Sequence, residues 1–436
     1  MNARGREETR RLSFEKQIYD SVHGYVGITE LERCIIDTPI FQRLRRVKQL
    51  GVADLVYPGA TQTRFAHSIG SLFVMDKIAS RLIDDQYVDQ EELQTLRLAA
   101  LLHDVGHYPF SHVIEKLMQR RHGDKGKHEA MSVRFIKNTG IATELKNYGY
   151  DPEKISAIIE NRADNRLFNY ILSSDLDVDK IDYLLRDAYH TGVAYGFIDI
   201  DRLIRTISVN EETSAQLAVL EKGRQAVENF LIGRYHMYQS VYYHKTVISF
   251  ELMLDKIYEG MLEERCEGVH DLENIEKMDE KHLAKFDDFY VWRQICEYNG
   301  SSDFLRELID LLCKRVSLKV AYEEPSLAKA EAETSICKVL SAVPIQRETL
   351  SKVSGVPEDW IFVSEPPPVD LIISSERETA VYIRKDKKYL PLVKDDTSIV
   401  HHLADFRYLS PRVYTKKECK EGLRKGLQTC YGIQLR

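Results

Sequence analysis

The feature that most constrains the fold is the helical spacing of apolar residues along roughly the first 320 positions. An amphipathic helix repeats its buried face every 3.6 residues. The clearest such positions are Leu72, Phe73, Ile78, Leu82, Leu96, Leu98, Leu101, Leu102, Val178, Ile181, Leu184, Leu185 and Ala188. The spacing predicts helices after His67, up to about Leu102 and over residues 178–188, and helix along residues 224–262. Gly106 and Pro109 end the second of these, and Ser111 is placed to cap the next helix.

The pattern changes after about Pro325. Residues 360–363, 369–373 and 407–409 are typical of short strands, whereas residues 329–341 and 416–427 are typical of helices. We therefore expect a mainly α protein: a polar tail over residues 1–15, a large helical domain over residues 16–325 and a small α+β lobe over residues 326–436.

Composition excludes several classes of protein. The 436 residues are 43% hydrophobic and 30% charged, which argues against low-complexity and disordered chains. The net charge of -7 gives no overall positive field, so we do not expect a nucleic-acid partner. There is no apolar run of about 18 residues and no secretory leader, so no membrane partner is expected. Seven scattered cysteines without a C-x-x-C spacing indicate reduced thiols, and we expect a cytoplasmic protein.

Side chains that can bind a metal or transfer a proton are most concentrated in the sequence His103-Asp104-Val105-Gly106-His107. An imidazole and a carboxylate at adjacent positions can share one metal if the helix ends there. An isolated His-Asp pair is more often a polar helix terminus. His67 and Asp179, each at the head of an expected helix, would complete a mixed nitrogen and oxygen site. Such a site suits one divalent ion, and Zn, Fe, Mn, Ni and Mg are not distinguished by the sequence.

Several segments in fixed order carry a family resemblance. They are DSVHG (20–24), IDTPIFQRLR (36–45), KQLG (48–51), YPGA (57–60), RFAHSIG (64–70), HDVGH (103–107), KHE (127–129), DVDK (177–180) and YYHK (242–245). In this order the chain resembles the HD-domain phosphohydrolases. It is most similar to the branch of SAM-and-HD-domain deoxynucleoside triphosphate triphosphohydrolases and their bacterial and archaeal relatives. The resemblance implies a helical HD domain that splits a dNTP into deoxynucleoside and tripolyphosphate.

The resemblance also implies roles for individual residues. The metal ligands would be His67, His103, Asp104 and Asp179, with a second Mg possible beside the nucleotide. His112 matches the catalytic histidine that protonates the leaving oxygen. Glu115 lies one helical step from His112, where the family usually has an aspartate, and would orient the imidazole. A supporting cluster would consist of His107, His128 and Glu129.

Further residues match the family's substrate contacts. Those that would hold the triphosphate or lie beside it are Arg64, Lys180, Arg234, Lys245 and Tyr183. Gln49 and Asp187 match contacts to the sugar 3′-hydroxyl, and Tyr242 matches an aromatic that packs under the deoxyribose. Without the matching motifs, each of these cations would be interpreted as a solvated surface charge, and Tyr242 as a core residue.

A second nucleotide site is implied in relatives that are activated by a guanine nucleotide or a dNTP between subunits of a tetramer. Asp37, Gln42 and Arg45 match its residue types, and Lys16 matches a phosphate contact, although Tyr19 replaces an asparagine. The alternative is that Asp37 caps a helix and Arg45 is a surface residue. The resemblance thus implies a homotetramer.

Two other functions remain open at this stage. One is an HD phosphohydrolase that acts on another nucleotide or phosphoester. The other is a nucleotide-binding or nucleic-acid-binding assembly with low turnover, against which the acidic composition and the four intact ligand positions weigh.

Overall fold

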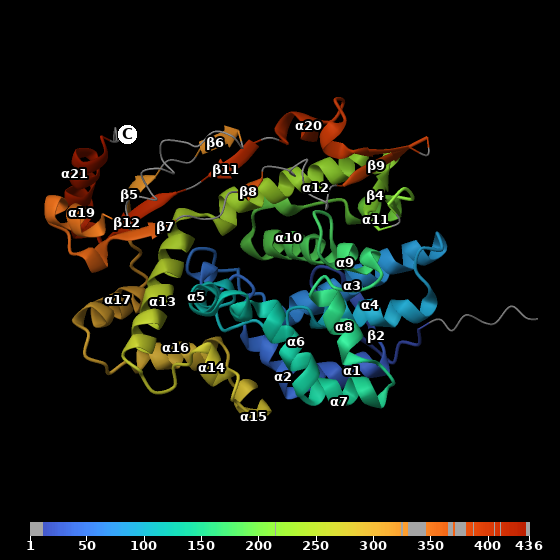
Figure 1. The fold of residues 1–436 in the computed structure, drawn as a ribbon, viewed down its shortest axis with the longest axis horizontal. Helices are drawn as coiled ribbons and strands as arrows, with labels where there is room; N and C mark the ends of the chain where they lie inside the picture. Colours follow the sequence, from blue (N-terminus) through green and yellow to red (C-terminus); the bar gives the residue numbers. More distant parts are fainter. Residues whose placement is uncertain are drawn as a thin grey trace, which may run out of the picture.

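The computed structural model describes residues 12–213, 215–323, 326–329, 346–364, 369–370, 381–386, 388–404, 406–409 and 411–432. The described residues are mainly helical with small sheets, so the mainly α prediction is confirmed. In Figure 1 the C-terminal strands lie along the upper edge of the molecule, and α3, α4 and α10 lie beneath them. No helix among the described residues is both long enough and apolar enough to cross a lipid bilayer.

The helices begin and end as follows: α1 Glu30–Ile36, α2 Pro39–Arg43, α3 Arg64–Asp84, α4 Gln90–Leu102, α5 His112–His122, α6 His128–Asn138, α7 Gly140–Asn147, α8 Pro152–Ile159, α9 Arg166–Leu172, α10 Val178–Thr191, α11 Ile200–Thr206, α12 Arg224–Met237, α13 Lys245–Glu263, α14 Leu272–Ile275, α15 Glu280–Leu283, α16 Asp288–Cys296, α17 Asp303–Cys313, α19 Arg347–Ser354, α20 Ile399–Leu403 and α21 Lys420–Tyr431. The strands are β1 Lys16–Asp20, β2 Gly24–Ile28, β3 Ile207–Val209, β4 Leu217–Leu220, β5 Lys319–Glu323, β6 Ser326–Lys329, β7 Phe362–Ser364, β8 Val369–Asp370, β9 Tyr382–Lys385, β10 Lys388–Pro391, β11 Phe406–Leu409 and β12 Arg412–Thr415.

Helix α3 lies at the centre of the core. It begins where the side chain of Thr63 accepts a hydrogen bond from the backbone of Ala66, which fixes its first turn. Its apolar face packs against α4 and α10, and residues such as Leu72 and Ile78 are fully buried. Because α3, α4 and α10 pack together, the N-terminal turn of α3, the C-terminal end of α4 and the first turn of α10 can form one site.

The structure corrects four local predictions. The predicted helix over residues 224–262 is two helices, α12 and α13, separated by a π turn at Tyr238–Tyr242. Ser111 stands at the N-cap position of α5, but its side chain makes no capping hydrogen bond. Trp360 lies in a 3-10 turn rather than a strand. Lys329 ends β6 instead of starting a helix, and residues 330–341 of that prediction lie outside the described residues.

The other C-terminal predictions agree with the structure over the described residues. The strand predicted over residues 369–373 is found at Val369–Asp370, and residues 371–373 lie outside the described part. Strand β11 covers the segment predicted at 407–409, and α21 covers most of the helix predicted at 416–427.

Strands from distant parts of the sequence share sheets. In the four-stranded sheet β10-β9-β4-β3, β4 pairs in parallel with β9, so that Val219 lies opposite Ile383. In another sheet β12 pairs with both β5 and β7. Sheets therefore join segments on both sides of residue 325, and the domain division expected there remains a prediction.

Candidate active site

The four predicted metal ligands come from three helix ends. His67 lies in the first turn of α3, and His103 is the C-cap residue of α4, directly before Asp104. Asp179 lies in the first turn of α10, whose N-cap is Asp177. Helix ends leave backbone groups and side chains free to turn inward, which is why the break at Gly106 is needed here.

The structure brings these four side chains together. His67 Nε2 lies 3.3 Å from His103 Nε2, 3.0 Å from Asp179 Oδ1 and 3.5 Å from Asp104 Oδ2. His103 Nε2 lies 3.3 Å from Asp104 Oδ1 and 3.7 Å from Asp179 Oδ1. Three segments that are far apart in the sequence thus direct two imidazole nitrogens and two carboxylates at one point.

The hydrogen bonds on the far side of each ring indicate what this point can hold. His103 Nδ1 donates to the carbonyl oxygen of Ala100 at 2.8 Å, and His67 Nδ1 donates to Asp182 Oδ2 at 2.8 Å. Both Nε2 atoms are then free to act as lone-pair donors toward the same space. Two lone pairs and two carboxylates repel one another unless a cation lies between them, so the donor set fits a divalent metal.

The charges of the site agree with a cation between the ligands. Burial by itself lowers the pKa of His67, but Asp179, Asp182 and Asp104 together raise it to about 10. Burial by itself raises the pKa of Asp179, but His103 and His67 lower it well below its ordinary value. The carboxylates therefore stay ionised and favour positive charge at this point, as a proton or as a metal.

A second layer of residues, which the sequence reasoning missed, holds His67. Asp182 is fully buried and also contacts His23 Nε2 at 2.6 Å and the guanidinium of Arg186 at 2.9 Å. Arg186 in turn donates to Asp20 at 2.9 Å. Two signals were present: the i,i+4 pair of Asp182 and Arg186 on the helix of Asp179, and the segment 20–24 among the resembling segments.

The predicted catalytic histidine lies beside this cluster. His112, the first residue of α5, has an exposed side chain, and its Nδ1 donates to Glu115 Oε2 at 2.7 Å. The other oxygen of Glu115 accepts from His128 Nδ1 at 2.7 Å. Burial alone raises the pKa of Glu115, but His112 and His128 lower it below its ordinary range, so it is a carboxylate. Glu115 therefore orients both rings.

The remaining members of the supporting cluster differ in their contacts. His107 stacks on His128 with ring centroids 3.9 Å apart, and its Nε2 lies 3.3 Å from Asp104 Oδ1. Burial, with Arg64 and His128 nearby, lowers the pKa of His107 well below its usual value, so its ring is neutral. Glu129 is partly exposed and lies 3.4 Å from His128 Nδ1.

Arg64 connects the predicted metal ligands to the histidine cluster. Its guanidinium is buried and donates to Asp104 Oδ2 at 2.5 Å and to Ser111 Oγ at 2.9 Å. Its Nη2 atom lies 3.5 Å from His112 Nε2. The structure thus places Arg64 within the site, bound to a carboxylate of the cluster.

Asp187 lies two turns along α10 from Asp179 and is surrounded by polar side chains. Gln62 Nε2 donates to Asp187 Oδ1 and the hydroxyl of Tyr242 donates to Asp187 Oδ2, each at 2.8 Å. Tyr183 packs edge-on against Tyr242, with ring centroids 6.1 Å apart. The buried side-chain oxygen of Gln49 has no hydrogen-bond partner among the described residues. Gln62 was not predicted, because no local pattern reveals its contact with Asp187.

The other predicted phosphate ligands lie beside acidic residues. Lys180 Nζ donates to Asp177 Oδ2 at 2.7 Å, while Arg234 Nη1 lies 3.7 Å from Asp175. Lys245, the first residue of α13, is exposed and lies 3.8 Å from Glu323.

The residues predicted for a second nucleotide site lie on β1, α1 and α2 and just after α2. Arg45 donates to Gln42 Oε1 at 2.8 Å and lies over the ring of Phe65. Asp37 is the C-cap of α1 and lies 3.5 Å from Arg33, whereas Lys16 is an exposed residue at the start of β1. Thr38, rather than Asp37, provides the N-cap of α2.

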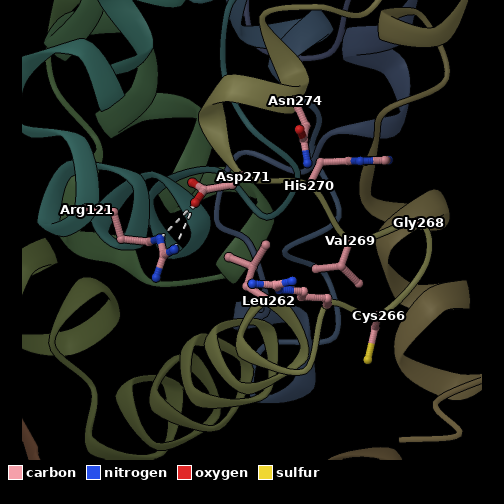
Figure 2. A pocket seen from close by; sticks show the side chains of 9 residues that line it. Arg121, Leu262, Cys266, Gly268, Val269, His270, Asp271 and Asn274 are labelled. Atoms are coloured by element: carbon pink, nitrogen blue, oxygen red, sulfur yellow. Dashed lines mark hydrogen bonds and ion pairs between the residues drawn. The ribbon is translucent and has the colours of Figure 1, made fainter.

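A cavity of about 440 Å³ lies elsewhere, between the ends of α5 and α13. Figure 2 shows Arg121 bound to Asp271 at this cavity, beside Leu262 and Val269. None of the predicted site residues lines it.

Comparisons with known proteins identify the family of this chain. The model of the HD domain matches residues 64–187, the segment from Arg64 to Asp187. The model of the HD associated region matches residues 198–436, which is more than half of the chain.

Individual relatives match part of the chain. An uncharacterised protein of Methanocaldococcus jannaschii is 36% identical over 285 residues, which are 65% of this chain and 58% of that protein. A protein of Dictyostelium discoideum named deoxynucleoside triphosphate triphosphohydrolase SAMHD1 homolog is 35% identical over 254 residues, 55% of this chain and 48% of that protein. The matches thus span about half the length of these relatives.

A solved structure extends the likeness to nearly the whole chain. The crystal structure of a hypothetical protein from Aquifex aeolicus has a TM-score of 0.75 and 28% sequence identity, and covers 94% of this chain and 99% of that one. Because the HD associated region matches more than half of this chain, the chain belongs to the family of HD-domain proteins that carry this region.

Proposed function

We propose that the protein is a metal-dependent deoxynucleoside triphosphate triphosphohydrolase, which converts a dNTP and water into a deoxynucleoside and tripolyphosphate. The observation that carries the proposal is the position of His112. Its Nδ1 is bound to Glu115, and its Nε2 lies beside Arg64, whose guanidinium is bound to the metal ligand Asp104. A proton donor therefore lies next to a cation and a metal site, which is the arrangement that hydrolysis of a phosphoester requires.

His67, His103, Asp104 and Asp179 would hold one divalent ion, whose identity the ligand types leave open, and a second Mg would accompany the nucleotide. When bound, the ion supplies Lewis-acid polarisation of a phosphoryl oxygen and a lowered pKa of water. Asp182 fixes the ring of His67 from the other side, so that its Nε2 points into the site.

His112 is the general acid of the proposed reaction. Water attacks the α-phosphorus and releases a proton to solvent, the bond between phosphorus and the 5′ oxygen breaks, and the leaving 5′ oxygen takes a proton from His112 Nε2, which solvent then restores. The carboxylate of Glu115 accepts from Nδ1 and stabilises the imidazolium before transfer. His107, His128 and Glu129 support this pair.

The remaining residues would bind the nucleotide. Arg64, Lys180, Arg234 and Lys245, with Tyr183 beside them, are the cations and the phenol available for the triphosphate. Asp187 would accept a hydrogen bond from the 3′-hydroxyl together with Gln49, and Tyr242 would pack under the deoxyribose. Buried acceptors such as the side-chain oxygen of Gln49 favour a ligand that donates a hydrogen bond.

The proposal extends to assembly and control. A guanine nucleotide or dNTP would activate the enzyme at Lys16, Asp37, Gln42 and Arg45, within a homotetramer in the cytoplasm. In support of a shared site for these residues, Gln42 and Arg45 contact each other at 2.8 Å.

The test is to incubate the purified protein with each dNTP and each divalent metal and to quantify tripolyphosphate and deoxynucleoside. We expect equal amounts of both products, and no turnover in His112→Gln or Asp104→Asn. His122→Gln, at the opposite end of the same helix, is the matched control and should remain active. Release of orthophosphate alone would instead favour another phosphohydrolase reaction, and tight single-strand binding without hydrolysis would favour a binding assembly.

A further inference from the structure

Two consecutive residues before the catalytic histidine adopt backbone conformations that side chains disfavour. Phe110 has a φ of 55°, and Ser111 has a φ of 53° with a ψ of -121°. The second pair of angles lies outside the regions open to residues with a Cβ atom, and only glycine adopts it without strain. Such strain persists only where surrounding contacts enforce it, and it is concentrated at functional sites.

The side chain of Ser111 makes contacts that enforce this conformation. Instead of capping α5, its hydroxyl donates to the backbone oxygen of Lys48 at 2.7 Å and accepts from Arg64 Nε at 2.9 Å. Ser111 is buried, so both hydrogen bonds are shielded from water.

A carboxylate from a distant part of the chain completes the clamp. Asp288, the first residue of α16, accepts from the backbone N–H of Phe110 at 2.7 Å through Oδ1 and from that of Lys48 at 2.9 Å through Oδ2. The backbone of Lys48 is therefore bound at its N–H by Asp288 and at its oxygen by Ser111. Asp288 lies within the HD associated region, whereas Ser111 lies within the HD domain.

The clamp acts on two groups of the proposed site. Ser111 directly precedes His112, so the angles at Ser111 set the direction in which the imidazole leaves α5. Its hydroxyl also fixes the guanidinium of Arg64, which contacts Asp104 and lies 3.5 Å from His112 Nε2. We infer that Ser111 and Asp288 are positioning residues that hold His112 and Arg64 in the geometry for proton transfer, an inference that rests on the proposed function.

Two substitutions separate the strain from the hydroxyl. Ser111→Ala removes both hydrogen bonds of the hydroxyl and leaves the strained backbone held only through Asp288. Ser111→Gly removes the same hydrogen bonds but adopts the backbone angles freely. Ser156→Ala is the matched control, because Ser156 is fully buried and also donates to a backbone oxygen, that of Pro152 at 2.7 Å, in α8.

We expect kcat with a dNTP to fall about 100-fold in Ser111→Ala and about 10-fold in Ser111→Gly, because a small misplacement of a reacting group is costly. KM and bound metal should stay close to the wild-type values in both, and Ser156→Ala should retain wild-type kcat. Ser111→Gly should also unfold at a higher temperature than Ser111→Ala. Wild-type kcat in both Ser111 variants, with only a lower unfolding temperature, would show a purely structural role and overturn the inference.

A measurement that does not require turnover distinguishes a failure of this inference from a failure of the proposed function. In ¹⁵N-histidine NMR, His112 Nδ1 should show the signal of a hydrogen-bonded N–H, assigned by its loss in His112→Gln. That signal should shift or broaden in Ser111→Ala and in Asp288→Asn, and remain unchanged in Ser156→Ala. An unchanged signal in the first two variants overturns the positioning role. If the wild type hydrolyses no dNTP while the signal responds as expected, the proposed function fails and the clamp stands.

Discussion

The Nε2 atoms of His67 and His103 lie 3.3 Å apart, although each ring already uses its Nδ1 atom to donate to another acceptor. Asp104 and Asp179 are directed at the same space. The two imidazole lone pairs and the two carboxylates therefore repel one another, and a cation between them removes this repulsion. The stability of the fold in this region should therefore depend on the ion.

Metal removal should destabilise the protein measurably. We expect dialysis against a chelator to lower the unfolding temperature, and an added divalent metal to restore it in a concentration-dependent manner. Metal at 100 times its dissociation constant stabilises the folded state by about 2.7 kcal/mol. Differential scanning fluorimetry with Asp179→Asn as the control checks this, because that variant should respond weakly. An equal response in both proteins would contradict the assigned ligands.

Asp182→Asn should weaken metal binding without removing a ligand. Asp182 fixes the ring of His67 through a 2.8 Å hydrogen bond, and the loss of such a partner typically costs about 10- to 100-fold in metal affinity. Competition with a chromophoric chelator measures the change. Asp255→Asn, which alters a carboxylate of α13 that pairs with Arg120 of α5 and contacts none of the four predicted ligands, should leave the affinity unchanged. Wild-type affinity in Asp182→Asn would show that the hydrogen bond does not orient the ligand.

The four candidate ligands could be predicted from the adjacent pair His103 and Asp104, from His67 and Asp179 at the heads of expected helices, and from the family resemblance. Gly106 ends the segment after His103, and an acidic N-cap precedes Asp179. Asp182 was missed although it forms an i,i+4 pair with Arg186, because that pair does not reveal the contacts with His67 and His23, which are 115 and 159 residues away. Long-range partners of this kind require the fold itself.

The same distinction explains the local predictions that were wrong. Ser111 has the residue type and position of an N-cap, but the backbone oxygen of Lys48 and the guanidinium of Arg64 bind its hydroxyl instead. The parallel pairing of β4 with β9 joins Val219 to Ile383 and has no local signature. The π turn at Tyr238–Tyr242 interrupts a continuous helical pattern that the apolar spacing alone could not divide.

Glu115→Gln should lower kcat by about 10- to 100-fold with little change in KM, because orientation and charge at the general acid affect the transition state. Glu115 accepts from His112 and His128 with different oxygens, and a glutamine would turn its amide N–H₂ group toward one of the two rings. Steady-state kinetics with the best dNTP measures the effect, and the exposed Glu263→Gln is the control. Unchanged kcat would mean that His112 does not depend on Glu115.

Asp187 gives a pH dependence of stability with a defined sign. Burial raises its pKa from 3.8 to about 6, although Gln62 and Tyr242 donate to it. Between these values the folded protein holds a proton that the unfolded chain has released, so this contribution stabilises the fold at low pH and is lost as the pH rises through about 6. At about 1.4 kcal/mol for each pKa unit, the loss amounts to about 3 kcal/mol.

Asp187→Asn should remove this loss of stability with rising pH, because an amide does not ionise. It can keep both hydrogen bonds, since its oxygen accepts from Gln62 and its N–H₂ donates to the hydroxyl of Tyr242. Denaturant unfolding at pH 4 and pH 7 measures the difference between the variant and the wild type. Relative to the wild type, the unfolding free energy of the variant should rise by about 2 kcal/mol over this interval, whereas that of the exposed Asp164→Asn should not change. A constant difference between Asp187→Asn and the wild type would show that Asp187 is already ionised in the folded protein at pH 4.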